Sequence, residues 1–160
     1  MRIAICPGSF DPITYGHLDI IKRATKIFDK VIVLVITNPT KTPAFDVNKR
    51  VEMINIATEG IPNVEADSYD GLLVNYVKEV GACAIVKGLR ATSDFEYEFQ
   101  MALTNKKLCD QVETIFLTTS MYNMYLSSSV VRQVACYGGD LSGLVPKKLH
   151  GIIKERFTKE

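Results

Sequence analysis

The side chains best suited to chemistry in this sequence are cations and hydroxyls that lie near the ends of predicted strands. His17, Lys41, Lys87 and Arg90 each follow or end an apolar stretch, and the triplet Ser127–Ser129 precedes a helical pattern. Imidazole, ammonium and guanidinium groups neutralise charge on phosphates, and serine hydroxyls donate hydrogen bonds to them. No Ser-His-Asp order, cysteine nucleophile or pair of catalytic carboxylates accompanies them. The set therefore predicts a site that aligns polyanions, with an attacking group that is already an anion.

The densest part of this set is the stretch from Pro7 to His17, which reads Pro-Gly-Ser-Phe-Asp-Pro-Ile-Thr-Tyr-Gly-His. It follows a short apolar strand pattern and precedes helical periodicity from Leu18 onwards. Gly8 permits a tight turn whose neighbouring amides can face a ligand. Thr14 is expected to cap the helix and to leave the amides of its first turn free, beside the imidazole of His17 as a donor. This strand–turn–helix unit predicts a phosphate site.

The remaining candidates have simpler alternative explanations. Lys41, taken alone, is more simply an ordinary solvated lysine in a loop. Lys87 and Arg90 favour a functional role, because ionised side chains beside a buried strand are rarely left unpaired. For Ser127–Ser129, helix capping and a second anion-binding helix start are about equally supported, because one cap explains only one serine.

Bulk composition narrows the class of protein. The chain carries 19 Lys and Arg against 18 Asp and Glu, a net charge of +1, which argues against a broad nucleic-acid or membrane surface. Its four cysteines are widely spaced and form no metal-like pattern with histidine, which favours reduced thiols in a cytoplasmic protein. No targeting signal or membrane-length apolar run is visible. With 160 residues, no repeat and no linker, we expect one domain over residues 1–160.

Apolar runs of strand length alternate with helical periodicity along the whole chain. Strands are expected at 3–6, 30–37, 64–69, 82–86 and 113–118. Helices are expected at 18–29, 47–59, 70–80 with Asp70 as its cap, 94–108, 130–137 and from Pro146 onwards. This alternation predicts an α/β fold, a Rossmann-like doubly wound five-stranded parallel sheet with helices on both faces. Ligands of such sheets bind beyond the carboxyl ends of the strands, where the candidate residues gather.

Three ordered motifs resemble those of a known enzyme family. The stretch ending Thr-Tyr-Gly-His at His17 is similar to the Thr-x-Gly-His signature of the nucleotidyltransferase superfamily. Lys87-Gly-Leu-Arg-Ala, continuing into Asp94-Phe-Glu-Tyr-Glu, and Leu126-Ser-Ser-Ser-Val resemble the second and third motifs of bacterial phosphopantetheine adenylyltransferases. The resemblance implies transfer of the adenylyl group of ATP to 4′-phosphopantetheine. The implied products are dephospho-coenzyme A and pyrophosphate, formed with Mg²⁺ in coenzyme A biosynthesis.

The same resemblance implies roles for individual residues. His17 would stabilise the transition state, with Lys41 and Arg90 as further catalytic groups. The implied contacts to 4′-phosphopantetheine are Ser9, Lys41, Leu73 and Lys87. The implied contacts to ATP are Ser9, Phe10, His17, Gly88, Leu89, Arg90, Glu98, Asn123, Met124, Tyr125, Leu126, Ser127, Ser128 and Ser129. Mg²⁺ would be carried by the phosphates of ATP, without a dedicated protein ligand. The family usually has arginine where this chain has Lys87, and lysine keeps the charge but loses the bidentate fork.

The helix expected from Asp94 onwards carries two apolar stripes, one through Phe95 and Phe99 and the other through Tyr97 and Met101. We expect the sheet and a second copy of the chain to cover these stripes between them. The resemblance implies a homo-oligomer, namely a hexamer, and feedback inhibition by coenzyme A. The alternative is a helix that lies deeper within its own domain.

Other functions remain open on the sequence. A sister nucleotidyltransferase that acts on a nicotinate, glycerol or ethanolamine phosphate would share the first motif, whereas the block from Lys87 to Glu98 favours pantetheine. A class I aminoacyl-tRNA synthetase fragment would need a Lys-Met-Ser-Lys-Ser-like loop and a basic surface, which the sequence lacks. A non-catalytic ATP-binding module fits the glycine turn but gives no reason for His17 beside the lysines.

Overall fold

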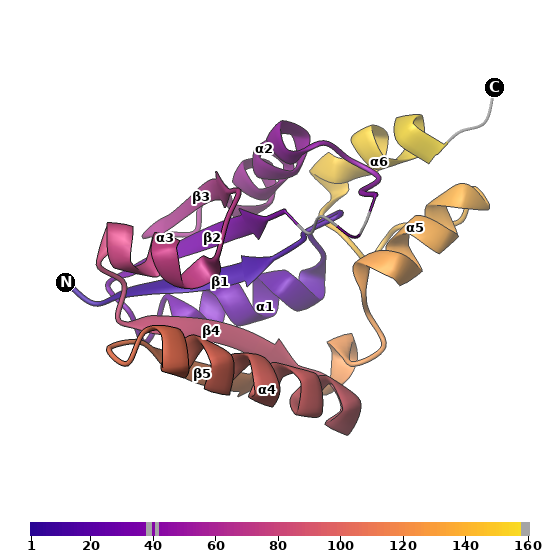
Figure 1. Ribbon diagram of the computed structural model, residues 1–160. Coiled ribbons are helices and arrows are strands. Elements are labelled where there is room, and N and C mark those ends of the chain that lie inside the picture. Colours follow the sequence, from indigo (N-terminus) through magenta and orange to yellow (C-terminus); the bar gives the residue numbers. More distant parts are fainter. Residues whose placement is uncertain (38–39, 41, 158–160) are drawn as a thin grey trace.

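The computed structural model describes residues 1–37, 40 and 42–157, with the backbone but not the side chains of residues 92 and 93. Its centre is a parallel sheet of five strands in the order β3-β2-β1-β4-β5 (Figure 1). The strands are β1 (Ile3–Gly8), β2 (Lys30–Ile36), β3 (Val64–Tyr69), β4 (Ala84–Leu89) and β5 (Glu113–Thr118). The central strands are apolar on both faces, as a sheet covered on both sides requires. The predicted doubly wound α/β fold is confirmed.

Helices cover both faces of the sheet and divide the core into two clusters of buried side chains (Figure 1). The helices are α1 (Tyr15–Ala24), α2 (Val47–Thr58), α3 (Leu73–Val80), α4 (Thr92–Leu108), α5 (Ser128–Cys136) and α6 (His150–Phe157). Helices α1, α2, α5 and α6 contribute to the larger cluster, which includes Cys6 and Val33. Helix α3 packs on the opposite face, over Ile5 and Leu34, and α4 lies next to α3 against β4 and β5. Alternate residues of one strand therefore serve different layers.

Several predicted boundaries differ from the structure. Helix α1 ends at Ala24 rather than near Asp29, and the Thr25 hydroxyl donates to the carbonyl of Lys22 at its end. Strand β4 ends at Leu89, so the expected strand 82–86 starts and stops too early. Its register with β5 pairs Lys87 with Phe116, which extends the ladder into the functional motif.

Asp70 does not cap helix α3, contrary to prediction. The N-cap residue is Leu72, whose side chain makes no capping hydrogen bond, and Gly71 separates it from Asp70. At the other end, Gly81 stops the helix in the left-handed conformation, with φ 66°, as its position predicts. Pro146 precedes a short 3₁₀ turn (Lys147–Leu149), and the final helix α6 follows that turn.

Helix α4 leaves its apolar side chains exposed in this chain. Phe95, Phe99 and Leu103 are 42%, 47% and 57% exposed, and Tyr97 and Met101 of the second stripe are also exposed. The chain's own sheet covers the Phe95–Phe99 stripe only in part, through the edge-to-face contact of Phe95 with Phe116 of β5, and it leaves the second stripe exposed. Within the described ranges, no helix has both the length and the hydropathy needed to cross a membrane.

Candidate active site

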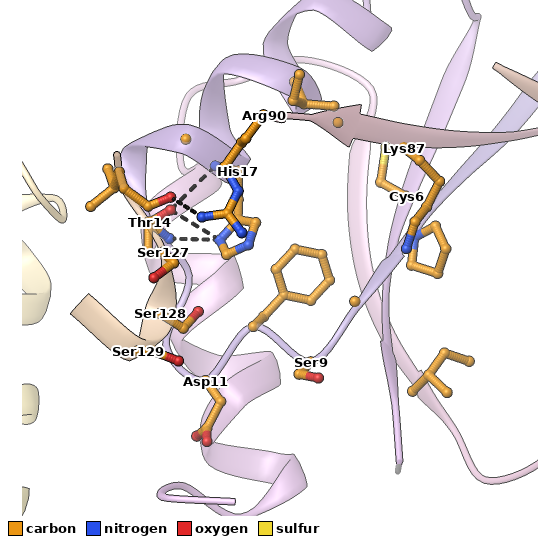
Figure 2. A pocket seen from close by; sticks show the side chains of 18 of the residues that line it. Cys6, Ser9, Asp11, Thr14, His17, Lys87, Arg90, Ser127, Ser128 and Ser129 are labelled. Carbon is orange, nitrogen blue, oxygen red and sulfur yellow. Dashed lines mark hydrogen bonds between the residues drawn. The ribbon is translucent and has the colours of Figure 1, made fainter. Parts of the chain in front are cut away.

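A cavity of about 780 Å³ lies at the carboxyl ends of β1, β2 and β4 (Figure 2). This volume suits a ligand the size of a nucleotide. The cavity brings together most of the residues that the sequence singles out. Those that line it are Ser9, Phe10, His17, Lys87, Gly88, Arg90, Glu98, Leu126, Ser127, Ser128 and Ser129. The sequence motifs therefore converge on one site, as the topology predicts.

Other predicted residues lie elsewhere. Leu73 lines a neighbouring cavity of about 340 Å³, which Ser9, Lys87 and Glu98 also border. The two cavities therefore meet at these shared residues. Some of the implied ATP contacts do not line the larger cavity, namely Leu89, Asn123, Met124 and Tyr125. Lys41 lies outside the described residues.

His17 is held by a reciprocal cap at the start of α1. The Thr14 backbone N–H donates to His17 Nδ1 at 3.0 Å, and the His17 backbone N–H donates to the Thr14 hydroxyl at 3.4 Å (Figure 2). Histidine thus takes the place that glutamate or glutamine has in a capping box. Because Nδ1 accepts a hydrogen bond, a neutral imidazole carries its proton on Nε2 and remains a donor.

The expectation that first-turn amides stay free is wrong for two of them. The amide of His17 bonds to Thr14, and that of Tyr15 donates to the carbonyl of Leu144 at 3.0 Å. The α1 terminus therefore offers an oriented imidazole more than a row of open amides. Phe10 supports this ring from the side, since the two ring centroids lie 5.0 Å apart at 69°.

The site keeps His17 neutral. Burial, and to a smaller extent the positive charges of Arg90 and Lys87, together lower the pKa of its imidazole from 6.5 to about 4. At neutral pH the ring is therefore a hydrogen-bond donor through Nε2 and carries no charge. Such a group can stabilise an oxyanion without delivering its proton.

This shift predicts a loss of stability in acid. Between pH 6.5 and 4 the unfolded chain protonates His17 and the folded chain does not, so the free energy of unfolding falls as the pH drops. The part of the free energy of unfolding that depends on His17 should fall by about 2 kcal/mol between pH 7 and pH 4.5. Urea unfolding of the wild type and of His17→Gln measures this difference, because Gln suits the cap but does not titrate. Equal losses in both proteins would contradict the assignment.

The strand-end cations are each paired with a carboxylate of α4. Lys87 Nζ lies 3.1 Å from Glu98 Oε1, and Arg90 Nε lies 3.4 Å from Asp94 Oδ2. Arg90 also donates through Nη1 to the carbonyl of Leu126 at 3.0 Å. It therefore joins the end of β4 to the segment that leads into α5. Arg90 and His17 both line the cavity, and the charge of the guanidinium acts on the imidazole.

Each hydroxyl of the serine triplet already has a partner. Ser127 caps α5 by accepting from the amide of Val130 at 3.2 Å, and Ser128 donates to the carbonyl of Pro12 at 2.7 Å. Ser129 accepts from Arg132 at 3.2 Å. Only Ser127 caps the helix, so two serines are left over from capping, as predicted, although each of the three hydroxyls has a partner within the chain. They nevertheless line the cavity at the start of α5, where anions bind favourably.

Sequence reasoning missed two arginines that hold the turn after β1. Arg50 of α2 is only 3% exposed and donates through Nη1 to the carbonyl of Ser9 at 2.9 Å. Arg132 of α5 donates through Nη1 to the carbonyl of Asp11 at 2.6 Å. Both also line the cavity. The only signal for Arg132 was its place one turn after the serine triplet, and Arg50 resembled an ordinary helix-surface cation.

Asp11 ties the same turn to the following loop. Its buried carboxylate accepts from the amides of Ala44 at 2.8 Å and Phe45 at 2.9 Å. Phe10, just before it, adopts a positive φ of 47°, which non-glycine residues rarely take. The turn is therefore held in an unusual shape by contacts from α2, α5 and the 42–45 loop. This positions Ser9 and Phe10 at the cavity wall.

The carboxylates of the cavity have protein partners in the described part of the chain. Asp94 and Glu98 pair with cations, and Asp11 accepts backbone amides. No group of three metal-ligating side chains occurs among the described residues. A hard cation such as Mg²⁺ takes oxygen ligands, and triphosphate oxygens supply them.

Cys6 also borders the cavity but is a poor nucleophile. Burial raises the pKa of its thiol to about 12, although the charge of Lys87 acts in the opposite direction. Cys109 is also buried, whereas Cys83 and Cys136 are exposed. Brief treatment with iodoacetamide at pH 8 should therefore modify Cys83 and Cys136 first, as mass spectrometry of peptides would show. Equally fast alkylation of Cys6 would contradict this picture.

Comparisons with known proteins agree with this geometry. Residues 5–134 match the family described as cytidylyltransferase-like. A protein of Caldanaerobacter subterraneus subsp. tengcongensis named phosphopantetheine adenylyltransferase is 58% identical, over 99% of each chain. Proteins with the same name from Clostridium novyi and Carboxydothermus hydrogenoformans are 57% and 54% identical, and the matches cover 97% and 99% of their lengths. The same two matches span 99% and 100% of this chain.

Solved structures share the fold at low sequence identity. A Vibrio parahaemolyticus protein described as a candidate nicotinate-nucleotide adenylyltransferase matches with a TM-score of 0.70 at 17% identity, over 96% of this chain and 99% of that one. A lipopolysaccharide core biosynthesis protein of Thermoplasma volcanium matches with a TM-score of 0.57 at 24% identity, over 75% of this chain and 98% of its own. These two likenesses support the fold alone. The full-length identity to the curated relatives and the three motifs together show that this chain belongs to the phosphopantetheine adenylyltransferase family of cytidylyltransferase-like proteins.

Proposed function

We propose that this protein transfers the adenylyl group of ATP to 4′-phosphopantetheine, forming dephospho-coenzyme A and pyrophosphate in coenzyme A biosynthesis. The observation that carries the proposal is the meeting of a neutral His17 donor, two strand-end cations and the start of α5 in one cavity. Full-length identity to relatives of that name supports the same reaction.

The chemistry needs alignment and charge neutralisation more than acid–base groups. An oxygen of the acceptor phosphate forms a bond to the α-phosphorus of ATP as the bond from that phosphorus to the bridging oxygen breaks, and pyrophosphate leaves. The attacking oxygen is already anionic, so no side chain has to remove a proton. His17 Nε2–H and the Arg90 guanidinium would stabilise charge on the oxygens of the transferred group.

Substrate placement follows from the two joined cavities. We assign ATP to the larger one, in contact with Ser9, Phe10, His17, Gly88, Arg90 and the Leu126–Ser129 segment. The acceptor phosphate would meet Ser9 and Lys87 at the junction, with Lys41 as a further expected contact. The smaller cavity, which Leu73 lines, suits the pantetheine arm. Contacts of ATP with Leu89, Glu98 and Asn123–Tyr125 stay predictions.

We also propose that Mg²⁺ enters as the MgATP complex, held by phosphate oxygens. The ion would offset charge on the triphosphate and assist departure of pyrophosphate. The paired state of Asp94 and Glu98 supports this assignment over a dedicated protein site.

We further propose a homo-oligomer, with a hexamer as the expected form, in which the exposed apolar side chains of α4 are covered. Sedimentation of a monomer at micromolar concentration would contradict this. The cytoplasm is the proposed location, supported by four free cysteines. Coenzyme A contains the pantetheine arm of the acceptor and is the proposed feedback inhibitor.

A substrate panel tests the proposed function. The wild type is incubated with MgATP and, separately, 4′-phosphopantetheine, nicotinate mononucleotide, glycerol phosphate or ethanolamine phosphate. Pyrophosphate release and product mass are then measured. The expected result is dephospho-coenzyme A from the first acceptor and little product from the others. Preference for another acceptor would favour the related-nucleotidyltransferase alternative and refute the substrate proposed here.

A further inference from the structure

The Lys87–Glu98 pair lies where the two cavities meet. Both side chains border both cavities, and they are only 25% and 19% exposed. Lys87 comes from β4, which lies between β1 and β5 in the sheet, and Glu98 comes from the second turn of α4. The carboxylate of Glu98 is thus paired with the ammonium group of Lys87 at the place where an incoming phosphate would bind.

The neighbouring Arg90–Asp94 pair differs in one respect. Asp94 also accepts the backbone N–H of Arg90 at 3.3 Å, so its carboxylate has a structural role at the start of α4. Arg90 in turn has the carbonyl of Leu126 as a second acceptor. Lys87 and Glu98, by contrast, have each other as their recorded charged partner among the described residues. Their pairing therefore needs another explanation.

We propose that Glu98 is an internal counter-ion that occupies Lys87 until the acceptor phosphate displaces it. The inference rests on the proposed function and assigns Glu98 a positioning role through Lys87. A half-buried ammonium requires an anion, and Glu98 supplies one when the cavity holds no substrate. A dianionic phosphate beside Lys87 then meets the negative charge of Glu98, which disfavours simultaneous contact.

This exchange sets the affinity of the junction for phosphates. A phosphate must break the ion pair in order to bind to Lys87. The pair therefore lowers the affinity of the junction for acceptor and product alike. An ion pair at this degree of exposure is worth about a fivefold change in affinity. Removing the carboxylate charge should therefore tighten phosphate binding by about fivefold. The effect should require the ammonium of Lys87.

The first experiment uses inorganic phosphate as the probe, so that it does not depend on turnover. Phosphate is titrated into the full-length protein while amide shifts of Ser9 and Gly88 are followed by ¹H–¹⁵N NMR. Glu98→Gln should bind phosphate about fivefold more tightly than the wild type. The matched control is Glu96→Gln, which removes the same charge from an exposed position of the same helix and should leave the affinity unchanged.

Two further variants assign the effect to Lys87. In a Lys87→Met background, Glu98→Gln should give no gain. Glu98→Asp, which withdraws the carboxylate by one methylene, should lie between the wild type and Glu98→Gln, and it serves if Glu98→Gln is poorly folded. Unchanged phosphate affinity in Glu98→Gln, or a gain that persists without Lys87, would overturn the proposal.

Steady-state kinetics provide a second readout. Glu98→Gln should lower the KM for 4′-phosphopantetheine about fivefold, whatever its effect on the KM for ATP through the predicted nucleotide contact. A higher KM for ATP with an unchanged KM for the acceptor would make Glu98 a nucleotide contact alone and overturn the counter-ion role. If the wild type fails to use 4′-phosphopantetheine, the proposed function fails, but the phosphate titration still decides this inference.

Discussion

Replacing His17 with alanine is expected to lower kcat by about 10²–10³-fold, with the Kd for ATP changed far less. The imidazole is neutral, oriented by Thr14 and placed as an Nε2–H donor in the cavity. Its hydrogen bond should strengthen only as charge builds on the oxygens of the transferred group. Removing it therefore affects the transition state more than the ground state. Pyrophosphate release measures kcat, and calorimetry with a non-hydrolysable ATP analogue measures binding.

Two controls separate catalysis from stability. His17→Gln can still accept the Thr14 N–H and so maintain the cap of α1, which shows how much of the loss comes from an altered helix start. His150→Ala removes the other histidine of the chain, whose Nε2 contacts the carbonyl of Val145 away from the cavity, and should leave kcat within about twofold. Wild-type turnover in a folded His17→Ala protein would contradict the role of His17.

Arg90→Ala is expected to lower kcat/KM by about 10²-fold. The variant loses a guanidinium that lines the proposed ATP cavity and the hydrogen bond that joins the end of β4 to the carbonyl of Leu126. It should also raise the pKa of His17 from about 4, since Arg90 is one of two charges that lower it. Kinetics measure the first effect, and NMR titration of the imidazole measures the second.

A conservative substitution at the same position and an arginine substitution outside the cavity serve as controls for this result. Arg90→Lys retains the charge, so it should restore the lowered pKa of His17 but only part of the rate, because a single ammonium cannot reproduce the fork. Arg2→Ala removes an exposed arginine that pairs with Asp29 at 3.5 Å, outside the cavity, and should have no effect. A normal rate in Arg90→Ala would remove the guanidinium from the mechanism.

Hydrophobic patterning was enough to predict the order of elements. The run from Val31 to Val35 is β-branched or apolar at every position and is buried on both faces, so only a central strand suits it. Boundaries were less accurate because long-range pairing sets them. Lys87 and Gly88 look like loop residues by composition, yet pairing with β5 includes them in β4. Asp70 had the right chemistry for a cap, but the chain begins α3 after Leu72.

The motifs of the candidate site could be identified in the sequence because their groups are close together in the chain or follow strands. Thr14 and His17 are three residues apart, and their reciprocal contact is a local feature of a helix start. Arg50 and Arg132 were missed because they act on the β1 turn from 41 and 121 residues away. The pairing of Lys87 with Glu98 was missed for a similar reason, since it depends on how α4 lies against β4. The apolar stripes of α4 could be identified in the sequence, but the sequence alone could not say what covers these exposed side chains.

The stereochemical course at the α-phosphorus tests the central claim, direct displacement by the acceptor phosphate without an enzyme nucleophile. ATP with sulfur of defined configuration on its α-phosphate is the substrate, and the configuration of the thio-substituted dephospho-coenzyme A is determined. A single in-line displacement predicts inversion. Retention would contradict the account, because it would require an adenylyl group attached to a side chain of this cavity.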